Sequence, residues 1–133
     1  MITEIYYFSG TGNSLVVARD IAGKTNGKLI SIPSVMDKDS ITTDADVVGI
    51  VFPVYHAIFN GMPLIIGRFI RKMENIDSKY IFAVCTCMGW SRVTINKVGE
   101  IIKTRGGQLN FPVFSKEYWL ARMPDCADLM LYA

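Results

Sequence analysis

The feature that most constrains how this chain can fold is a short glycine-bearing segment, residues 9–14, that follows an apolar run. The segment reads Ser-Gly-Thr-Gly-Asn-Ser, and Leu15-Val16-Val17-Ala18 follows it. An apolar run that breaks into small polar residues before a second apolar stretch is typical of a strand, a tight turn and the first turn of a helix. Such a turn presents backbone N–H groups and hydroxyls at the positive end of the helix dipole. We therefore predict a phosphate-binding loop.

The loop contains no lysine, which separates it from common nucleotide-binding motifs. Loops for phosphoryl transfer have the form GxxxxGKS or GxxxxGKT, and no lysine lies between residues 1 and 18. The Gly-Lys-Thr at 23–25 has Ala18 where that motif needs its first glycine. The dinucleotide fingerprint GxGxxG fails because Leu15 replaces the third glycine. A hydroxyl-rich loop without cations suits a phosphomonoester that is bound and never transferred, and riboflavin phosphate, FMN, is the common ligand of that description.

Apolar runs and amphipathic stretches alternate along the chain. The predicted strands cover residues 5–8, 29–32, 47–52, 80–85 and 109–114, and the predicted helices cover 13–23, 63–74 and 91–105. We expect Pro63 to be the first residue of its helix, and Val93 to face inward with Val98. This α/β alternation predicts a doubly wound parallel sheet. With 133 residues, 50% of them hydrophobic, the chain forms one domain, residues 1–133, whose sheet is covered on both faces.

Residues 9–14 resemble the phosphate loop of the flavodoxin family at every position. That loop reads Ser or Thr, any residue, Thr, Gly, Asn or Thr, then Ser or Thr. The resemblance implies a flavodoxin-like sheet of order 2-1-3-4-5, in which the first, third and fourth strands end side by side at the site where such sheets bind ligands. It also implies noncovalently bound FMN. The implied phosphate contacts are Ser9, Gly10, Thr11, Gly12, Asn13 and Ser14.

Two later segments, residues 52–63 and 86–90, resemble the flavin-contacting loops of the same family. The resemblance implies that the first segment lies along one side of the flavin ring and that the second meets its pyrimidine edge. Tyr55, His56 and Trp90 are the candidates for stacking, with aromatic core or a partner surface as the alternative for Tyr55 and Trp90. Ala57 stands near the place of a glycine whose peptide turns toward the reduced ring in flavodoxins. The implied contacts are Pro53, Val54, Tyr55, His56, Ala57, Asn60, Gly61, Thr86, Cys87, Met88, Gly89 and Trp90.

Composition restricts the classes of partner and compartment. A net charge of +2 is too small to indicate nucleic acid or an anionic membrane, and it departs from the acidic character usual in flavodoxins. No apolar run reaches the length of about 18 residues that a membrane span needs. Three cysteines without the spacing of a secreted framework favour the reducing cytoplasm. A single histidine does not complete a metal site with Cys85 and Cys87.

The end of the chain differs from a complete flavodoxin. After the strand at 109–114 there is no room for a full final helix, so that helix is missing or replaced. Residues 5–14, 49–55 and 123–125 most resemble the flavodoxin half of anaerobe proteins that fuse it to a two-cluster ferredoxin. No ferredoxin cysteine run is present, so we expect a truncated product or a stand-alone variant. We expect residues 118–132 to fold over the gap, or two chains to cover each other as a homodimer.

Three functions fit these observations. The first is a small FMN-binding electron carrier that works between redox partners such as a ferredoxin or a reductase. The second is an FMN-dependent NAD(P)H:quinone or flavin reductase, for which we see no nicotinamide pocket and assign no catalytic residue. The third is a flavin-less, flavodoxin-like interaction module, which Ala57 and the short C-terminal segment keep open.

Overall fold

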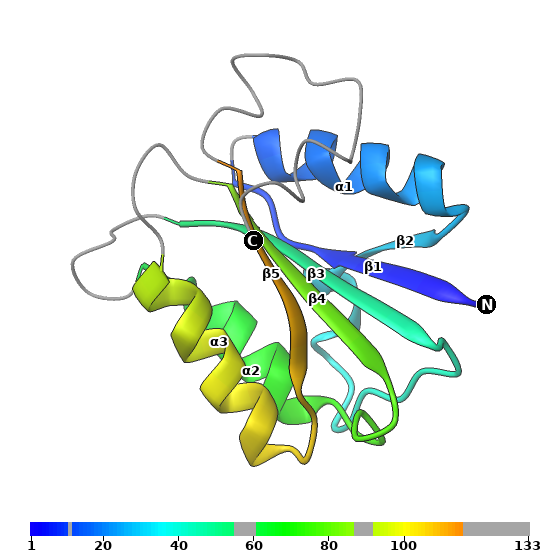
Figure 1. Cartoon of the computed structure of the whole chain (residues 1–133), viewed down its shortest axis with the longest axis vertical. Helices are drawn as coiled ribbons and strands as arrows, with labels where there is room; N and C mark the ends of the chain where they lie inside the picture. The colour runs from blue at the N-terminus through cyan, green and yellow to red at the C-terminus, as the bar shows by residue number, and fades with distance from the viewer. Residues whose placement is uncertain (11, 55–60, 87–91, 116–133) are drawn as a thin grey trace.

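The computed structural model describes residues 1–10, 12–54, 61–86 and 92–115, and it contains one five-stranded parallel sheet flanked by helices (Figure 1). The sheet has the order β2-β1-β3-β4-β5, and each neighbouring pair is parallel. This confirms the predicted doubly wound sheet and its strand order. The elements are β1 (Thr3–Tyr7), α1 (Asn13–Thr25), β2 (Lys28–Ser31), the 3-10 helix η1 (Ile32–Val35), β3 (Val47–Pro53), α2 (Leu64–Lys72), β4 (Tyr80–Thr86), α3 (Arg92–Thr104) and β5 (Leu109–Ser115).

The helices cover the two faces of the sheet unequally. Figure 1 shows α1 on one face and α2 and α3 on the other. Beneath α1, a small core joins Val17, Ala18 and Ile21 to side chains of the central strands, Ile5, Val51 and Val84. The larger core lies on the other face, where α2, α3 and η1 bury side chains such as Phe52 and Phe69. The prediction that a final helix beside α1 is missing or replaced falls on residues 116–133, which lie outside the described residues.

Most element boundaries agree with the sequence expectation to within two residues, and two expectations are wrong. Pro63 precedes α2 as its N-cap, with an extended ψ of 141°, and α2 begins at Leu64. Val93 is 55% exposed, whereas Thr94 and Val98 are buried. An α-helix turns about 100° per residue, so Val93 lies roughly 140° around α3 from Val98 and cannot share its buried face.

A polar cluster on β1 lies beside the larger core. The Tyr6 hydroxyl donates to Glu4 Oε2 at 2.7 Å, and the Thr43 hydroxyl donates to the same carboxylate oxygen. The ring of Tyr6 packs against Phe69 with 5.0 Å between centroids. Burial and the hydrogen bond to Glu4 raise the pKa of the Tyr6 phenol well above its ordinary value. Tyr6 therefore stays neutral, and the carboxylate of Glu4 joins β1 to the segment that leads into β3.

Gly49, in the middle of β3, has no room for a side chain. A Cβ at this position would lie 2.4 Å from Cζ of Phe82 and 2.9 Å from Cδ1 of Ile5. Gly23, in the exposed last part of α1, has no heavy atom within 4 Å of its Cβ position. We predict that Gly49→Ala lowers the free energy of unfolding by about 1–3 kcal/mol through overpacking. The control Gly23→Ala should raise it by about 0.5–1 kcal/mol, because Ala is the better helix former.

Urea unfolding followed by circular dichroism measures both changes. Equal stability of the Gly49→Ala variant and the unmodified chain would contradict the close packing between β3 and β4.

Candidate functional site

The carboxyl ends of β1, β3 and β4 form one edge of the sheet. β1 lies between β2 and β3, and the chain leaves β1 and β3 for opposite faces of the sheet. Pro53 is in register with Thr86, and the Val54 N–H donates to the Thr86 carbonyl at 3.0 Å. On the other side, the Phe8 N–H donates to the Val51 carbonyl at 2.9 Å. The first, third and fourth strands thus end side by side, as an α/β ligand site requires.

The turn after β1 opens toward this edge. Gly12 has a φ of 95°, a left-handed conformation that glycine adopts readily and other residues avoid. Its N–H donates to Ser9 Oγ at 2.9 Å, which closes the turn. Within the described part of the chain, no heavy atom lies within 4 Å of the position that a Cβ would take at Gly12, so the described side of the turn borders open space. The Gly12 carbonyl accepts from the Val16 N–H at 3.1 Å and starts α1.

The positive end of the α1 dipole lies at the turn after β1. Among the residues that the structure describes, no side chain caps this helix, and its first turn contains no acidic residue. The first N–H groups of an α-helix have no acceptor within the helix. Ser9, Gly10 and Gly12 are uncharged, so they would hold an anion through amides, a hydroxyl and the helix dipole. The described residues therefore fit a phosphate group that needs no lysine.

Ser14 has a second role that the sequence did not indicate. Its Oγ lies 2.8 Å from Oγ1 of Thr86, and the two residues are only 1% and 7% exposed. This hydrogen bond joins the first turn of α1 to the last residue of β4. Ser14 and Thr86 were predicted as contacts in two separate loops, and the structure brings them together as one pair. The predicted strand order could have indicated this pair, because it places the ends of β1 and β4 at the same edge of the sheet.

The predicted site residues divide into two groups. Ser9, Gly10, Gly12, Ser14, Pro53, Val54 and Thr86 lie at the edge described above, Asn13 is the first residue of α1, and Gly61 has a positive φ of 62° just before α2. Thr11, Tyr55, His56, Ala57, Asn60, Cys87, Met88, Gly89 and Trp90 lie outside the described residues. The described residues therefore belong to the predicted phosphate end of the site and to the strand ends that lead into the loops predicted to flank the ring.

Sequence analysis missed a group of cations on α2. Arg68, Arg71 and Lys72 line an open groove together with Met36 and Ile65. Their spacing of three and four residues was a readable signal, because such residues share one face of a helix.

Two absences concern the described residues only. No helix in this part of the chain is both long enough and apolar enough to cross a membrane. Within the same residues, no group of three or more His, Cys, Asp or Glu side chains is arranged to hold a metal ion.

Similarity to known proteins is evident in structure and not in sequence. No family model and no curated protein sequence matches this chain. A solution structure of two-electron reduced flavodoxin from Megasphaera elsdenii has a TM-score of 0.69 at 17% identity, covering 97% of this chain and 93% of that one. A flavodoxin from Streptococcus pneumoniae TIGR4 has a TM-score of 0.64 at 13% identity, covering 98% of each chain. A flavoprotein from Lactobacillus acidophilus NCFM, solved in complex with FMN, has a TM-score of 0.58 at 13% identity, covering 93% and 99%.

These matches agree with the strand order and helix placement. The protein is an α/β protein whose β1, β3 and β4 end at one edge of a parallel sheet. More particularly, it has a flavodoxin-like fold, as the resemblance of residues 9–14 implied.

The hydrogen bond between Ser14 and Thr86 predicts a measurable coupling between the two residues. Ser14→Ala and Thr86→Val each remove one hydroxyl and leave its partner buried, so each should lower the free energy of unfolding by about 1–2 kcal/mol. The double variant should lose less than the sum, with a coupling of about 1 kcal/mol. Urea unfolding of the four proteins without added ligand measures this cycle. Strictly additive losses would show that the two hydroxyls do not bond to each other.

Proposed function

We propose that this chain binds FMN noncovalently at the carboxyl edge of the sheet and transfers electrons between redox partners. FMN, when bound, supplies a ring that accepts and releases electrons. The chain would hold the phosphate, place the ring and expose it to a partner. The proposal assigns no catalytic residue, because electron transfer through a bound flavin requires none from the protein.

The turn at Gly12 is the observation that carries this proposal. At this turn, at the start of α1, Gly12 has a left-handed conformation and its N–H bonds to Ser9 Oγ. No described residue fills the space beside Gly12, and no described side chain caps α1. Anions bind at such helix starts through N–H groups and the dipole. The absence of a charged side chain from Ser9, Gly10 and Gly12 supports a ligand whose phosphate is anchored and does not react.

The end of β4 supports the proposed place of the ring. Thr86 is held from two sides, by Ser14 through its hydroxyl and by Val54 through its carbonyl. These bonds fix the exits of β3 and β4 relative to the phosphate loop. The predicted ring contacts Tyr55, His56, Ala57, Asn60, Cys87, Met88, Gly89 and Trp90 belong to the segments that leave these exits and are part of the proposal.

Three similar structures support the same ligand class. Two are flavodoxins, and the third was solved with FMN. We favour an electron carrier over the NAD(P)H-dependent reductase and over the flavin-less module, because the turn at Gly12 suits a phosphate and the three similar structures are named flavodoxin or flavoprotein. A ferredoxin or a reductase is the proposed partner.

Three further points belong to the proposal. The cytoplasm is the proposed compartment, on the grounds of cysteine usage. Residues 118–132 would cover the sheet beside α1, or a second copy of the chain would do so. Light scattering of the purified protein distinguishes the last two arrangements.

Comparison of FMN with riboflavin tests the function directly. The two ligands share the ring and differ in the phosphate, so FMN should bind on the order of 100-fold more tightly or better, because each hydrogen bond to a charged group contributes about 1.5–3 kcal/mol. Quenching of flavin fluorescence during titration measures both affinities. Equal affinities would place the anchor elsewhere, and no binding at micromolar FMN would leave only the flavin-less module.

Substitution of Gly12 tests the role of the turn. Gly12→Ala should weaken FMN binding about tenfold or more, because a Cβ disfavours the positive φ and enters the open space. Gly23→Ala is the matched control and should leave FMN affinity unchanged. Riboflavin affinity should change little in either variant. Rapid oxidation of NADH or NADPH by the FMN-loaded chain alone would instead favour the reductase.

A further inference from the structure

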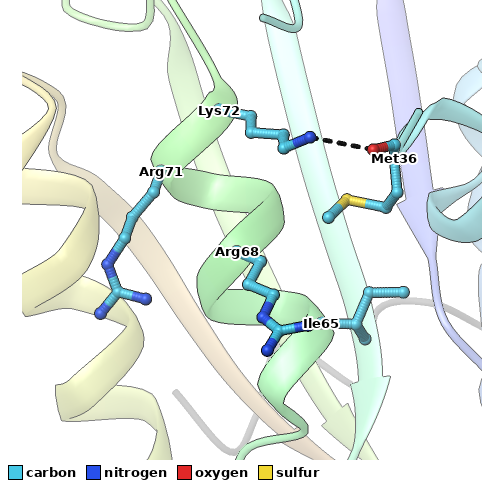
Figure 2. A pocket seen from close by; sticks show the side chains of 5 residues that line it. All are labelled: Met36, Ile65, Arg68, Arg71 and Lys72. Carbon is cyan, nitrogen blue, oxygen red and sulfur yellow. Dashed lines mark hydrogen bonds between the residues drawn. The ribbon is translucent and has the colours of Figure 1, made fainter. Parts of the chain in front are cut away.

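An open basic groove runs along α2. It has a volume of about 600 Å³ and is lined by Met36, Ile65, Arg68, Arg71 and Lys72. Figure 2 shows Lys72 reaching across to the segment that holds Met36, while Arg68 and Arg71 extend from the same helix. Three cations and two apolar side chains therefore form one surface, which we call the basic groove.

Among the residues that the structure describes, no carboxylate pairs with the cations of the basic groove. Lys72 Nζ donates to two backbone carbonyls, those of Met36 at 2.9 Å and Lys38 at 2.8 Å. Arg68 and Arg71 are exposed, and within the described part of the chain neither makes an ion pair. The nearby acids Asp37, Asp39 and Glu74 are also exposed, and none of them lines the groove. The groove thus presents an excess of positive charge to solvent.

Gly67 leaves room for the Arg71 guanidinium beside α2. The position that a Cβ would take at Gly67 lies 2.9 Å from Nη1 of Arg71. A larger residue at this position would push the guanidinium away from the helix. Lys72 is fixed by its two carbonyl bonds. One of the three cations therefore has a restricted position, which reduces the entropy lost when an anion binds.

The basic groove begins close to the edge of the sheet that carries the phosphate loop. α2 follows β3, whose carboxyl end lies beside those of β1 and β4. Ile65 is in the first turn of α2 and Lys72 is its last residue. At 1.5 Å per residue, the groove extends about 10 Å along the helix from that edge. A molecule bound in it would lie next to the exit of β3.

We propose that the basic groove is the docking site for an acidic protein partner, whose carboxylates pair with Arg68, Arg71 and Lys72. This inference rests on the proposed electron-transfer function and names the chemistry of its partner. A protein surface fits better than a small anion, because the groove is open to solvent and its cations are spread along α2 instead of converging on one point. Met36 and Ile65 supply apolar contact between the charges, as the centre of a protein interface needs.

Charge complementarity predicts how binding of the partner depends on salt. Opposite charges across an interface increase the rate of association and fix orientation, and salt screens them. An acidic partner steered to the basic groove would meet the flavin edge with a defined orientation. Binding should therefore weaken steeply as ionic strength rises.

A pair of charge-reversed variants with equal net charge tests this proposal. The first variant is R68E/R71E. The control is R19E/K28E, which changes two exposed cations on α1 and β2 by the same total charge. The probe is a fluorescently labelled two-cluster ferredoxin with negative net charge, and fluorescence anisotropy measures its binding to the chain with and without FMN. Inorganic phosphate and a duplex DNA oligonucleotide serve as competitors.

The expected result is a Kd that rises about tenfold or more in R68E/R71E and changes about twofold or less in R19E/K28E. Backbone amide shifts of the isotope-labelled chain should move at α2 and at residues 36–38 on addition of ferredoxin. Equal weakening in both variants, shifts on another face, displacement of ferredoxin by millimolar phosphate, tighter binding of the DNA than of the ferredoxin, or no ferredoxin binding would each overturn the proposal.

The same experiment separates this inference from the proposed function. Ferredoxin binding that depends on Arg68 and Arg71 but occurs in a chain unable to bind FMN would support the docking site and contradict the electron carrier. FMN binding with no effect of R68E/R71E on ferredoxin would contradict only the docking site.

Discussion

The parallel pairing of β1 with β3, and of β3 with β4, is the constraint on which the candidate site depends. Because parallel strands end at one edge, this pairing collects the turn after β1, the residues Pro53 and Val54, and Thr86 within reach of one another. The strands are buried between α1 on one face and α2 with α3 on the other, so their register is set by two cores. Gly49 allows close packing at the centre of the sheet, since Phe82 and Ile5 occupy the space that a side chain at this position would need.

The turn after β1, which is the proposed phosphate loop, is stabilised by bonds within the protein. Ser9 accepts from the Gly12 N–H, and Ser14 pairs with Thr86 across the strand ends. A loop held in this way loses little conformational entropy on binding, which favours affinity. It also means that the Ser14 hydroxyl contributes to the site by positioning β4, in addition to any contact that it makes with a ligand.

The charge of this chain differs from the acidic character that is usual in flavodoxins. The net charge of +2 is small, but Arg68, Arg71 and Lys72 concentrate positive charge on one groove beside the carboxyl edge of the sheet. A protein with a small net charge can therefore have a strongly positive surface region, since screening limits the effect of each charge to a range of about 8–10 Å. Local arrangement, and not net charge, decides which surface a partner meets.

Local sequence patterns were enough to predict the alternation of strands and helices, the five-stranded parallel sheet, and the glycine turn at residues 9–14. These follow from local patterns of hydrophobicity and from the conformational freedom of glycine. The prediction from sequence was wrong at Val93, because the burial of Thr94 and Val98 turns Val93 to the exposed side of α3. It was also wrong at Pro63, which is the N-cap that precedes α2 and not its first helical residue. The pairing of Ser14 with Thr86 and the contact of Met36 with the cations of α2 became visible only in the folded structure. Both contacts link residues distant in sequence, so they depend on how strands and helices pack and not on any local pattern.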